Sequence, residues 1–118
     1  MGSLTTHVLD TSAGRPARGL ALALFRLEDG RRQQIIEAVT NEQGRCDAPL
    51  LEGRAFSAGV YELLFETGAY FRRQSAATDE IPPFLDKVPV RFGVSRPDEH
   101  YHVPLLVTPW SYSTYRGS

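Results

Sequence analysis

The sequence predicts an all-β protein, a two-sheet sandwich of about eight short strands with one short helix. Apolar residues recur mainly with a period of two, as in Leu20–Phe25, where leucines alternate with alanines and a phenylalanine. Turn-forming dipeptides such as Asp29-Gly30 separate these segments at short intervals. Short alternating segments between frequent turns are typical of a β-sandwich.

Four strands are expected in the N-terminal half, between turn-forming residues. The first covers Leu4–Asp10, and the second covers Leu20–Phe25 and ends before the Asp29-Gly30 turn. The third, Gln33–Thr40, places Ile36, Ala38 and Thr40 on one face and ends at an Asn-Glu-Gln-Gly turn over residues 41–44. A short fourth strand is expected over Cys46–Leu50.

The C-terminal half is expected to contain four more strands and the helix. The fifth strand covers Phe56–Glu66, and the helix, of about two turns, covers Gly68–Ser75. Pro82-Pro83 lacks two backbone donors and therefore predicts a loop. The last three strands are expected over Val88–Val94, His100–Thr108 and Ser111–Tyr115.

Composition narrows the class of protein. At 118 residues, with 42% hydrophobic and 23% charged residues, the chain is expected to form a single globular domain over residues 1–118. A net charge of -1 and a pI of 6.3 leave little attraction to phosphates, so no nucleic-acid partner is expected. The longest apolar run, Leu20–Phe25, is far too short for a membrane span, and the N-terminus lacks the features of a signal peptide. We therefore expect a cytoplasmic protein without a membrane partner.

A metal site is not expected. Cys46 is the only cysteine, which excludes an intramolecular disulfide and a multi-cysteine metal site. It could serve as a nucleophile beside a histidine, but a lone cysteine next to a turn is more often a small packing residue. A zinc site on His7 and His102 would lack a third ligand, because Asp10 and Glu99 are expected on the opposite strand faces.

Two histidines are candidates for acid–base chemistry. His7 shares a strand face with Leu9, and His102 shares one with Leu106. A single imidazole among apolar neighbours is most often a half-buried structural residue. Two strands that each carry one weaken that interpretation, although parity alone does not show that the two side chains meet.

The C-terminal segment, residues 112–118, carries two tyrosines and an arginine and ends directly after the last predicted strand. The last residues of a domain are frayed by default. Alternatively, the last predicted strand, which runs to within three residues of the end, anchors this segment and places its arginine and hydroxyl groups in a pocket. The residues themselves leave both interpretations open.

Two sequence motifs lie near the two ends of the chain. The first motif is Leu-Thr-Thr-His-Val-Leu-Asp-Thr over residues 4–11, followed by Gly-Arg-Pro-Ala over residues 14–17. The second is His-Tyr-His-Val-Pro-Leu-Leu over residues 100–106, followed by residues 111–118, which end in Tyr-Arg-Gly-Ser. In these motifs the chain resembles the transthyretin-related 5-hydroxyisourate hydrolase family, and the terminal tetrapeptide distinguishes that family's hydrolases from transthyretin. The resemblance covers nearly the whole chain.

The resemblance implies a transthyretin-like sandwich that assembles as a homotetramer, a dimer of dimers, with active sites in the channel between the dimers. It also implies an enzyme that hydrolyses 5-hydroxyisourate, a small purine-derived substrate formed by urate oxidation, without a cofactor. His100 matches no catalytic position of the family. By this resemblance the catalytic residues are His7, Arg45 and His102, and the substrate-binding residues are Tyr115, Arg116, Gly117 and Ser118.

Two other functions remain open at this point. A transthyretin-like carrier would bind a small aromatic ligand in the same channel, but it would need neither the two imidazoles nor the arginine of the tail. A purely structural sandwich domain would leave His7, His102 and the tail without a role.

Overall fold

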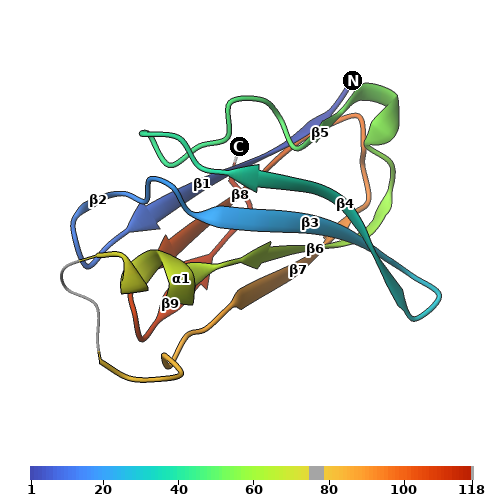
Figure 1. Cartoon of the computed structure of the whole chain (residues 1–118). Helices are drawn as coiled ribbons and strands as arrows, with labels where there is room; N and C mark the ends of the chain where they lie inside the picture. The colour runs from blue at the N-terminus through green and yellow to red at the C-terminus, as the bar shows by residue number, and fades with distance from the viewer. Residues whose placement is uncertain (75–78, 118) are drawn as a thin grey trace.

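The computed structural model describes residues 1–74 and 79–117, and in this part of the chain two β-sheets form a sandwich (Figure 1). The first sheet contains β2 (Arg15–Pro16), β1 (Ser3–Asp10), β8 (His100–Val107) and β9 (Tyr112–Thr114) in spatial order, with β5 (Leu51–Glu52) paired to β1. The second contains β4 (Arg31–Val39), β3 (Ala21–Glu28), β6 (Gly59–Phe65) and β7 (Val88–Val94) in spatial order. The helix α1 (Thr67–Arg72) lies at one end of the sandwich. The predicted all-β, two-sheet sandwich with one short helix is confirmed.

The first sheet is centred on a parallel pair, β1 with β8, which join the two ends of the chain. Their register places Thr5 beside His102 and His7 beside Pro104. Along β1 every second residue, beginning with Leu4, is buried, and the residues between them are only half-buried. The predicted parity of His7 is therefore confirmed: its side chain lies on the outward face of the first sheet.

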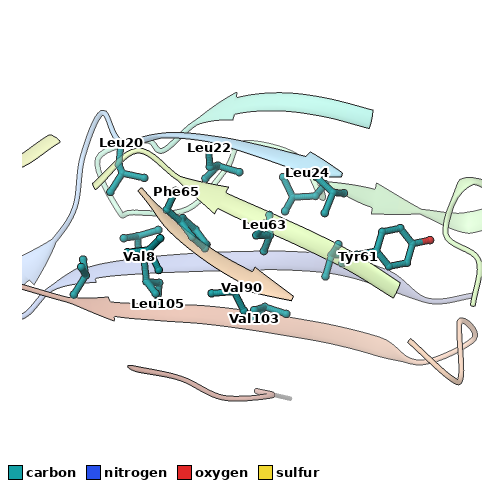
Figure 2. Close-up of a cluster of buried hydrophobic side chains, with 14 of the residues drawn as sticks. Val8, Leu20, Leu22, Leu24, Tyr61, Leu63, Phe65, Val90, Val103 and Leu105 are labelled. Carbon is teal, nitrogen blue, oxygen red and sulfur yellow. The ribbon is translucent and has the colours of Figure 1, made fainter. Parts of the chain in front are cut away.

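The inward faces of the two sheets form the hydrophobic core. Figure 2 shows their side chains pointing toward one another between the sheets. The first sheet contributes Leu4, Val8, Val103 and Leu105, and the second contributes Leu22, Leu24, Leu63, Phe65 and Val90. Burying a side chain of this size stabilises the fold by about 1.5–3 kcal/mol, so the core fixes which face of each strand points outward.

A buried carboxylate ties α1 to the first sheet. Asp10 Oδ1 accepts hydrogen bonds from the backbone N–H groups of Ser12 and Ala13 and from the Ser12 hydroxyl. Its Oδ2 accepts one from the Tyr70 hydroxyl at 2.8 Å. Burial and the Asp10 carboxylate raise the pKa of Tyr70 to about 12, so this hydroxyl remains a donor at neutral pH. Asp10 therefore has a structural role on the inward face.

The hairpin between β3 and β4 is longer than the sequence predicts. Asp29 and Gly30 both have positive φ angles, 52° and 74°, which a two-residue type I′ turn requires. The two strands therefore pair up to the turn itself, with Glu28 beside Arg31. The pattern of apolar residues did not reveal the strand ends over residues 26–28 and 31–32, because these residues are mostly charged.

Other predicted bounds need correction. No strand covers Cys46–Leu50; the chain forms one bridge at Arg45 and then the short β5, and Pro49 has no N–H to donate to a ladder. The strand expected over Phe56–Glu66 is shorter, since β6 covers only Gly59–Phe65. The expected helix begins one residue earlier, at Thr67, and Ser75 lies outside the described residues.

The strand β2, which the sequence analysis did not predict, pairs with the end of β1. The strands predicted over Val88–Val94 and from His100 are confirmed, the second ending one residue early. The described residues hold no helix with the length and hydropathy of a membrane span.

Candidate active site

The site is built on the outward face of β1 and β8. Because these strands run parallel and in register, Thr5 and His102 are direct neighbours. His7 lies two residues farther along β1, which places its Cα about 8 Å from that of His102. The structure therefore brings the two predicted histidines onto one surface.

A tight loop over residues 41–47 places Arg45 beside β1. The Asn41 side chain accepts hydrogen bonds from the backbone N–H groups of Gln43 and Arg45. Gly44 has a φ of 76° and its carbonyl accepts a hydrogen bond from Val8 at 2.8 Å. A Cβ at this position would collide with the Val8 carbonyl oxygen, so the loop can approach β1 only with glycine there. The result is an antiparallel bridge between Arg45 and His7.

The two imidazoles are held through different ring nitrogens. His7 Nε2 donates to the Gln43 carbonyl at 2.8 Å, so in the neutral ring Nδ1 carries the lone pair. His102 uses Nδ1, which lies 2.8 Å from the Thr5 hydroxyl. This contact leaves His102 Nε2 as the nitrogen that can meet a bound molecule.

Burial and positive charge keep both imidazoles neutral. For His7, burial is the largest cause of a lowered pKa and the Arg45 charge is the second, while the hydrogen bond to Gln43 acts in the opposite direction. For His102, burial again lowers the pKa most, followed by Arg45, His100 and His7. At pH 7 each ring can therefore accept a proton, as a general base must.

The C-terminal segment is paired along β8 and is not frayed over residues 112–117. The strand β9 runs antiparallel to β8, with Tyr112 beside Val107. The chain then continues backward until the Gly117 N–H donates to the His102 carbonyl at 2.7 Å. A Cβ on Gly117 would lie only 2.8 Å from His102 Cδ2, so this close approach requires glycine. Ser118 lies outside the described residues.

Arg116 is held by protein groups. Its guanidinium donates to Glu99 Oε1 at 2.9 Å and to the His100 carbonyl at 3.3 Å, and its Cζ lies 3.9 Å from the centre of the Tyr101 ring. These contacts fasten the tail at the position where a substrate donor was predicted. Glu99 was expected on the opposite strand face from His102, and this is wrong: because it precedes β8, it lines the same hollow as His102.

Two hollows meet at His100 and His102. The first, of ≈ 470 Å³, lies between β1, β8 and the segment after Arg45, and Thr5, Arg45 and Pro49 are part of its lining. The second is lined by Glu99, Tyr115, Arg116 and Gly117 together with the two histidines. Arg45 and the tail therefore approach His102 from different sides. His7 borders Arg45 through the backbone bridge.

The arrangement suits proton transfer next to a positive charge. Two neutral imidazoles can exchange protons with a bound molecule, and a guanidinium can stabilise an oxygen that gains negative charge. Cys46 does not fit a nucleophilic role, because burial and then Asp47 raise the pKa of its thiol. In residues 1–74 and 79–117, no three histidine, cysteine or acidic side chains are grouped so that they could hold a metal ion.

Sequence reasoning missed Thr5, Asn41 and Gln43. Thr5 shares the strand parity of His7, and that signal could have placed it on the site's face. Asn41 and Gln43 act through loop hydrogen bonds, which no periodicity reveals.

Comparisons with known proteins agree with this geometry. A model of the HIUase/Transthyretin family matches residues 4–117. A protein of Ralstonia nicotianae named 5-hydroxyisourate hydrolase is 58% identical over 118 residues, which is 100% of both chains. The structure of an (S)-allantoin synthase has a TM-score of 0.91 at 48% identity over 99% of this chain, which spans only 44% of that protein. Sea bream transthyretin in complex with thyroxine has a TM-score of 0.87 at 34% identity, over 98% of this chain and 94% of that one.

Proposed function

The chain belongs to the HIUase/transthyretin family, and on that premise we propose that it hydrolyses 5-hydroxyisourate. This is the step that converts the product of urate oxidation to 2-oxo-4-hydroxy-4-carboxy-5-ureidoimidazoline on the route from urate to allantoin. The observation that carries the proposal is the meeting of two neutral imidazoles and Arg45 on one outward face, beside the Tyr-Arg-Gly tail.

The same face argues against the carrier alternative. The backbone matches sea bream transthyretin with a TM-score of 0.87 and the 5-hydroxyisourate hydrolase of Klebsiella pneumoniae with a TM-score of 0.80, so fold alone does not separate the two functions. The side chains do separate them. A carrier of a small aromatic ligand needs apolar contact area, whereas the first hollow is bordered by Thr5, Arg45 and His102.

In the proposed reaction, water attacks a ring carbonyl carbon, a C–O bond forms and the ring C–N bond breaks. Arg45 holds the carbonyl oxygen and stabilises the charge it gains. His7 takes a proton from the attacking water through Nδ1, the nitrogen that its bond to Gln43 leaves available. His102 gives a proton to the leaving ring nitrogen through Nε2, since Nδ1 is bound to Thr5. The new carboxyl group ionises, so each turnover releases one proton.

The direct test is spectrophotometric. Urate is oxidised to 5-hydroxyisourate in the cuvette, and its absorbance is followed with and without the protein. We expect the decay to accelerate in proportion to protein concentration. An unchanged decay, with the protein folded and assembled, would overturn the proposal in favour of the carrier.

The acid limb of the pH profile should lie below pH 6.5, the ordinary histidine value. Both imidazoles act in their neutral forms, and burial with Arg45 lowers both pKa values, so activity survives to a lower pH before protonation removes it. Arg45→Met removes the positive charge and should move the limb upward in pH, while Arg45→Lys should leave it near the wild-type position. The readout is kcat/KM against pH. A limb that moves equally in the two variants would contradict this electrostatic role.

We also propose a homotetramer, a dimer of dimers, with the outward face of the first sheet covered by other copies. In the single chain this face exposes Tyr115 and leaves Leu106 only half-buried. Exposed apolar groups gathered around a polar site are typical of an interface.

Sedimentation at micromolar concentration should give the mass of four chains. Leu106→Glu should dissociate them, whereas Val60→Glu, on the outward face of the other sheet, should not. A wild-type monomer would remove the channel from the proposal.

We propose the cytoplasm as the location. Cys46 is a free thiol and the only cysteine of the chain, which fits a reducing compartment.

A further inference from the structure

A chain of hydrogen bonds leads from His102 to the exposed end of β8. His102 Nδ1 lies 2.8 Å from the Thr5 hydroxyl oxygen, which lies 3.3 Å from His100 Nε2. His100 Nδ1 lies 2.6 Å from the Ser3 hydroxyl. The two imidazole rings are stacked, with centroids 6.4 Å apart and an interplanar angle of 12°. His100 is exposed, so the chain connects the site to solvent in this subunit.

The parallel register of β1 and β8 produces this alternation of hydroxyls and imidazoles. It pairs Ser3 with His100 and Thr5 with His102, and these residues point to the outward face because strand parity repeats every second residue. The arrangement thus follows from the main-chain pairing and does not depend on one flexible side chain.

Two hydrogen arrangements satisfy all three contacts. In the first, His102 Nδ1–H donates to Thr5, Thr5 donates to His100 Nε2, and His100 Nδ1–H donates to Ser3. In the second, every donor and acceptor is exchanged: Ser3 donates to His100, His100 to Thr5, and Thr5 to His102. The first leaves a lone pair on His102 Nε2, and the second leaves a proton there. Moving one proton along the chain converts one arrangement into the other.

The reaction proposed above needs such a device. His102 is neutral at pH 7, and a neutral imidazole that gives up its remaining proton becomes a strongly basic anion. It can act as an acid only if a second proton reaches Nδ1 as the first leaves Nε2. Thr5 is the group in contact with Nδ1.

We propose that Ser3, His100 and Thr5 form a proton relay that protonates His102 Nδ1 while His102 Nε2 protonates the leaving nitrogen of the substrate. The relay rests on the proposed hydrolysis. The protons balance. As the ring C–N bond breaks, the leaving nitrogen gains a proton from His102 Nε2, and the Thr5 hydroxyl gives a proton to His102 Nδ1. His100 Nε2 then gives a proton to Thr5, and His100 Nδ1 receives one from solvent water through the Ser3 hydroxyl. Thr5 and His100 are positioning residues, because they act through His102.

The charges around the relay favour this neutral route. His7 and Arg45 face His102 from β1 and the adjacent loop, and both oppose a positive charge on it. Glu99, the acidic group of the second hollow, is paired with Arg116 and Arg96. Arg45, His100 and His7 all lower the pKa of His102 and so oppose a lasting imidazolium there, and concerted transfer avoids forming one.

The first test compares Thr5→Val with Thr5→Ser in steady-state assays of the assembled enzyme. Thr5→Val keeps the shape of the side chain but removes the hydroxyl, and kcat should fall at least about tenfold with KM nearly unchanged. Thr5→Ser should restore most of the lost turnover. Thr11→Val is the matched control, because it removes a hydroxyl that bonds a backbone carbonyl just beyond the end of β1, and its turnover should equal that of wild type.

The second test uses chemical rescue. His100→Phe keeps an aromatic ring but breaks the relay, so kcat should fall about fivefold or more in dilute buffer and recover as imidazole is added, because imidazole can deliver protons to Thr5. Turnover that is unaffected in Thr5→Val, or losses that neither serine nor imidazole restores, would overturn the relay. Wild-type protein without activity would instead refute the proposed function, so the two failures are distinguishable.

Discussion

Replacing His102 with asparagine or alanine should lower turnover at least about 100-fold, the usual scale for a positioned acid or base. The side chain has Arg45 and the Thr5 hydroxyl as neighbours, and asparagine cannot both receive a proton and pass one on. The fold should survive, since His102 lies on the half-buried outward face of β8 and not in the core. Steady-state kcat measures the loss, and a thermal melt within a few degrees of wild type shows that the variant is folded.

The same substitutions at His100 should be much milder, because solvent and buffer can replace a relay residue more easily than the imidazole at the reacting bond. Turnover of the His102 variants within a few-fold of wild type would remove this residue from the chemistry. A larger loss at His100 than at His102 would mean that the other imidazole of the pair is the acid.

Removing residues 115–118 should abolish most activity and leave a folded, assembled protein. The strand β9 ends at Thr114, whose hydroxyl is bonded to the Pro104 carbonyl, so the sheet keeps its ladder after the truncation. The truncation removes Gly117, which is bonded to the His102 carbonyl, and Arg116, which closes the second hollow. The measurements are turnover, sedimentation and the far-UV spectrum. A truncated protein with wild-type turnover would refute the assignment of the tail to the site.

Arg116→Ala should be nearly as damaging as the truncation, since a lost charged donor is worth about 1.5–3 kcal/mol. The structure allows two causes to be separated. Glu99→Gln removes the ion pair but leaves the guanidinium in place. If Arg116 mainly anchors the tail, both variants should lose turnover together. If it mainly binds substrate, Glu99→Gln should retain turnover, because it frees the donor.

The sequence predicted the fold well where every second residue of a strand is buried in the core. The bounds of β1 and β8 were predicted to within one residue, because each strand has one face in the core. Prediction failed where backbone geometry and loop hydrogen bonds, rather than the pattern of apolar residues, determine the structure. The region over Cys46–Leu50 is irregular because the loop is organised around Asn41 and Gly44, and such hydrogen bonds leave no periodic signal.

For the site, strand parity gave the face of His7 and His102 but not the contacts made there. Which ring nitrogen is free depends on Thr5 and Gln43, and these partners follow from the register of β1 against β8 and from a loop that crosses beside β1. The ion pair of Arg116 with Glu99 likewise requires the tail to fold back along β8, which alternation in the tail does not specify.

The parallel pairing of β1 with β8 also determines when the site can form during folding. Thr5 and His102 are separated by 97 positions in the chain. Closing so long a loop costs conformational entropy before the contacts between the strands stabilise the pair. Hairpins such as β3–β4 have short loops and can form early. The histidines and the tail can therefore meet only after most of the sandwich has formed. We expect a partly folded chain to lack the site. Recovery of activity should accordingly report the last stage of refolding, and the slow, non-local topology sets its rate.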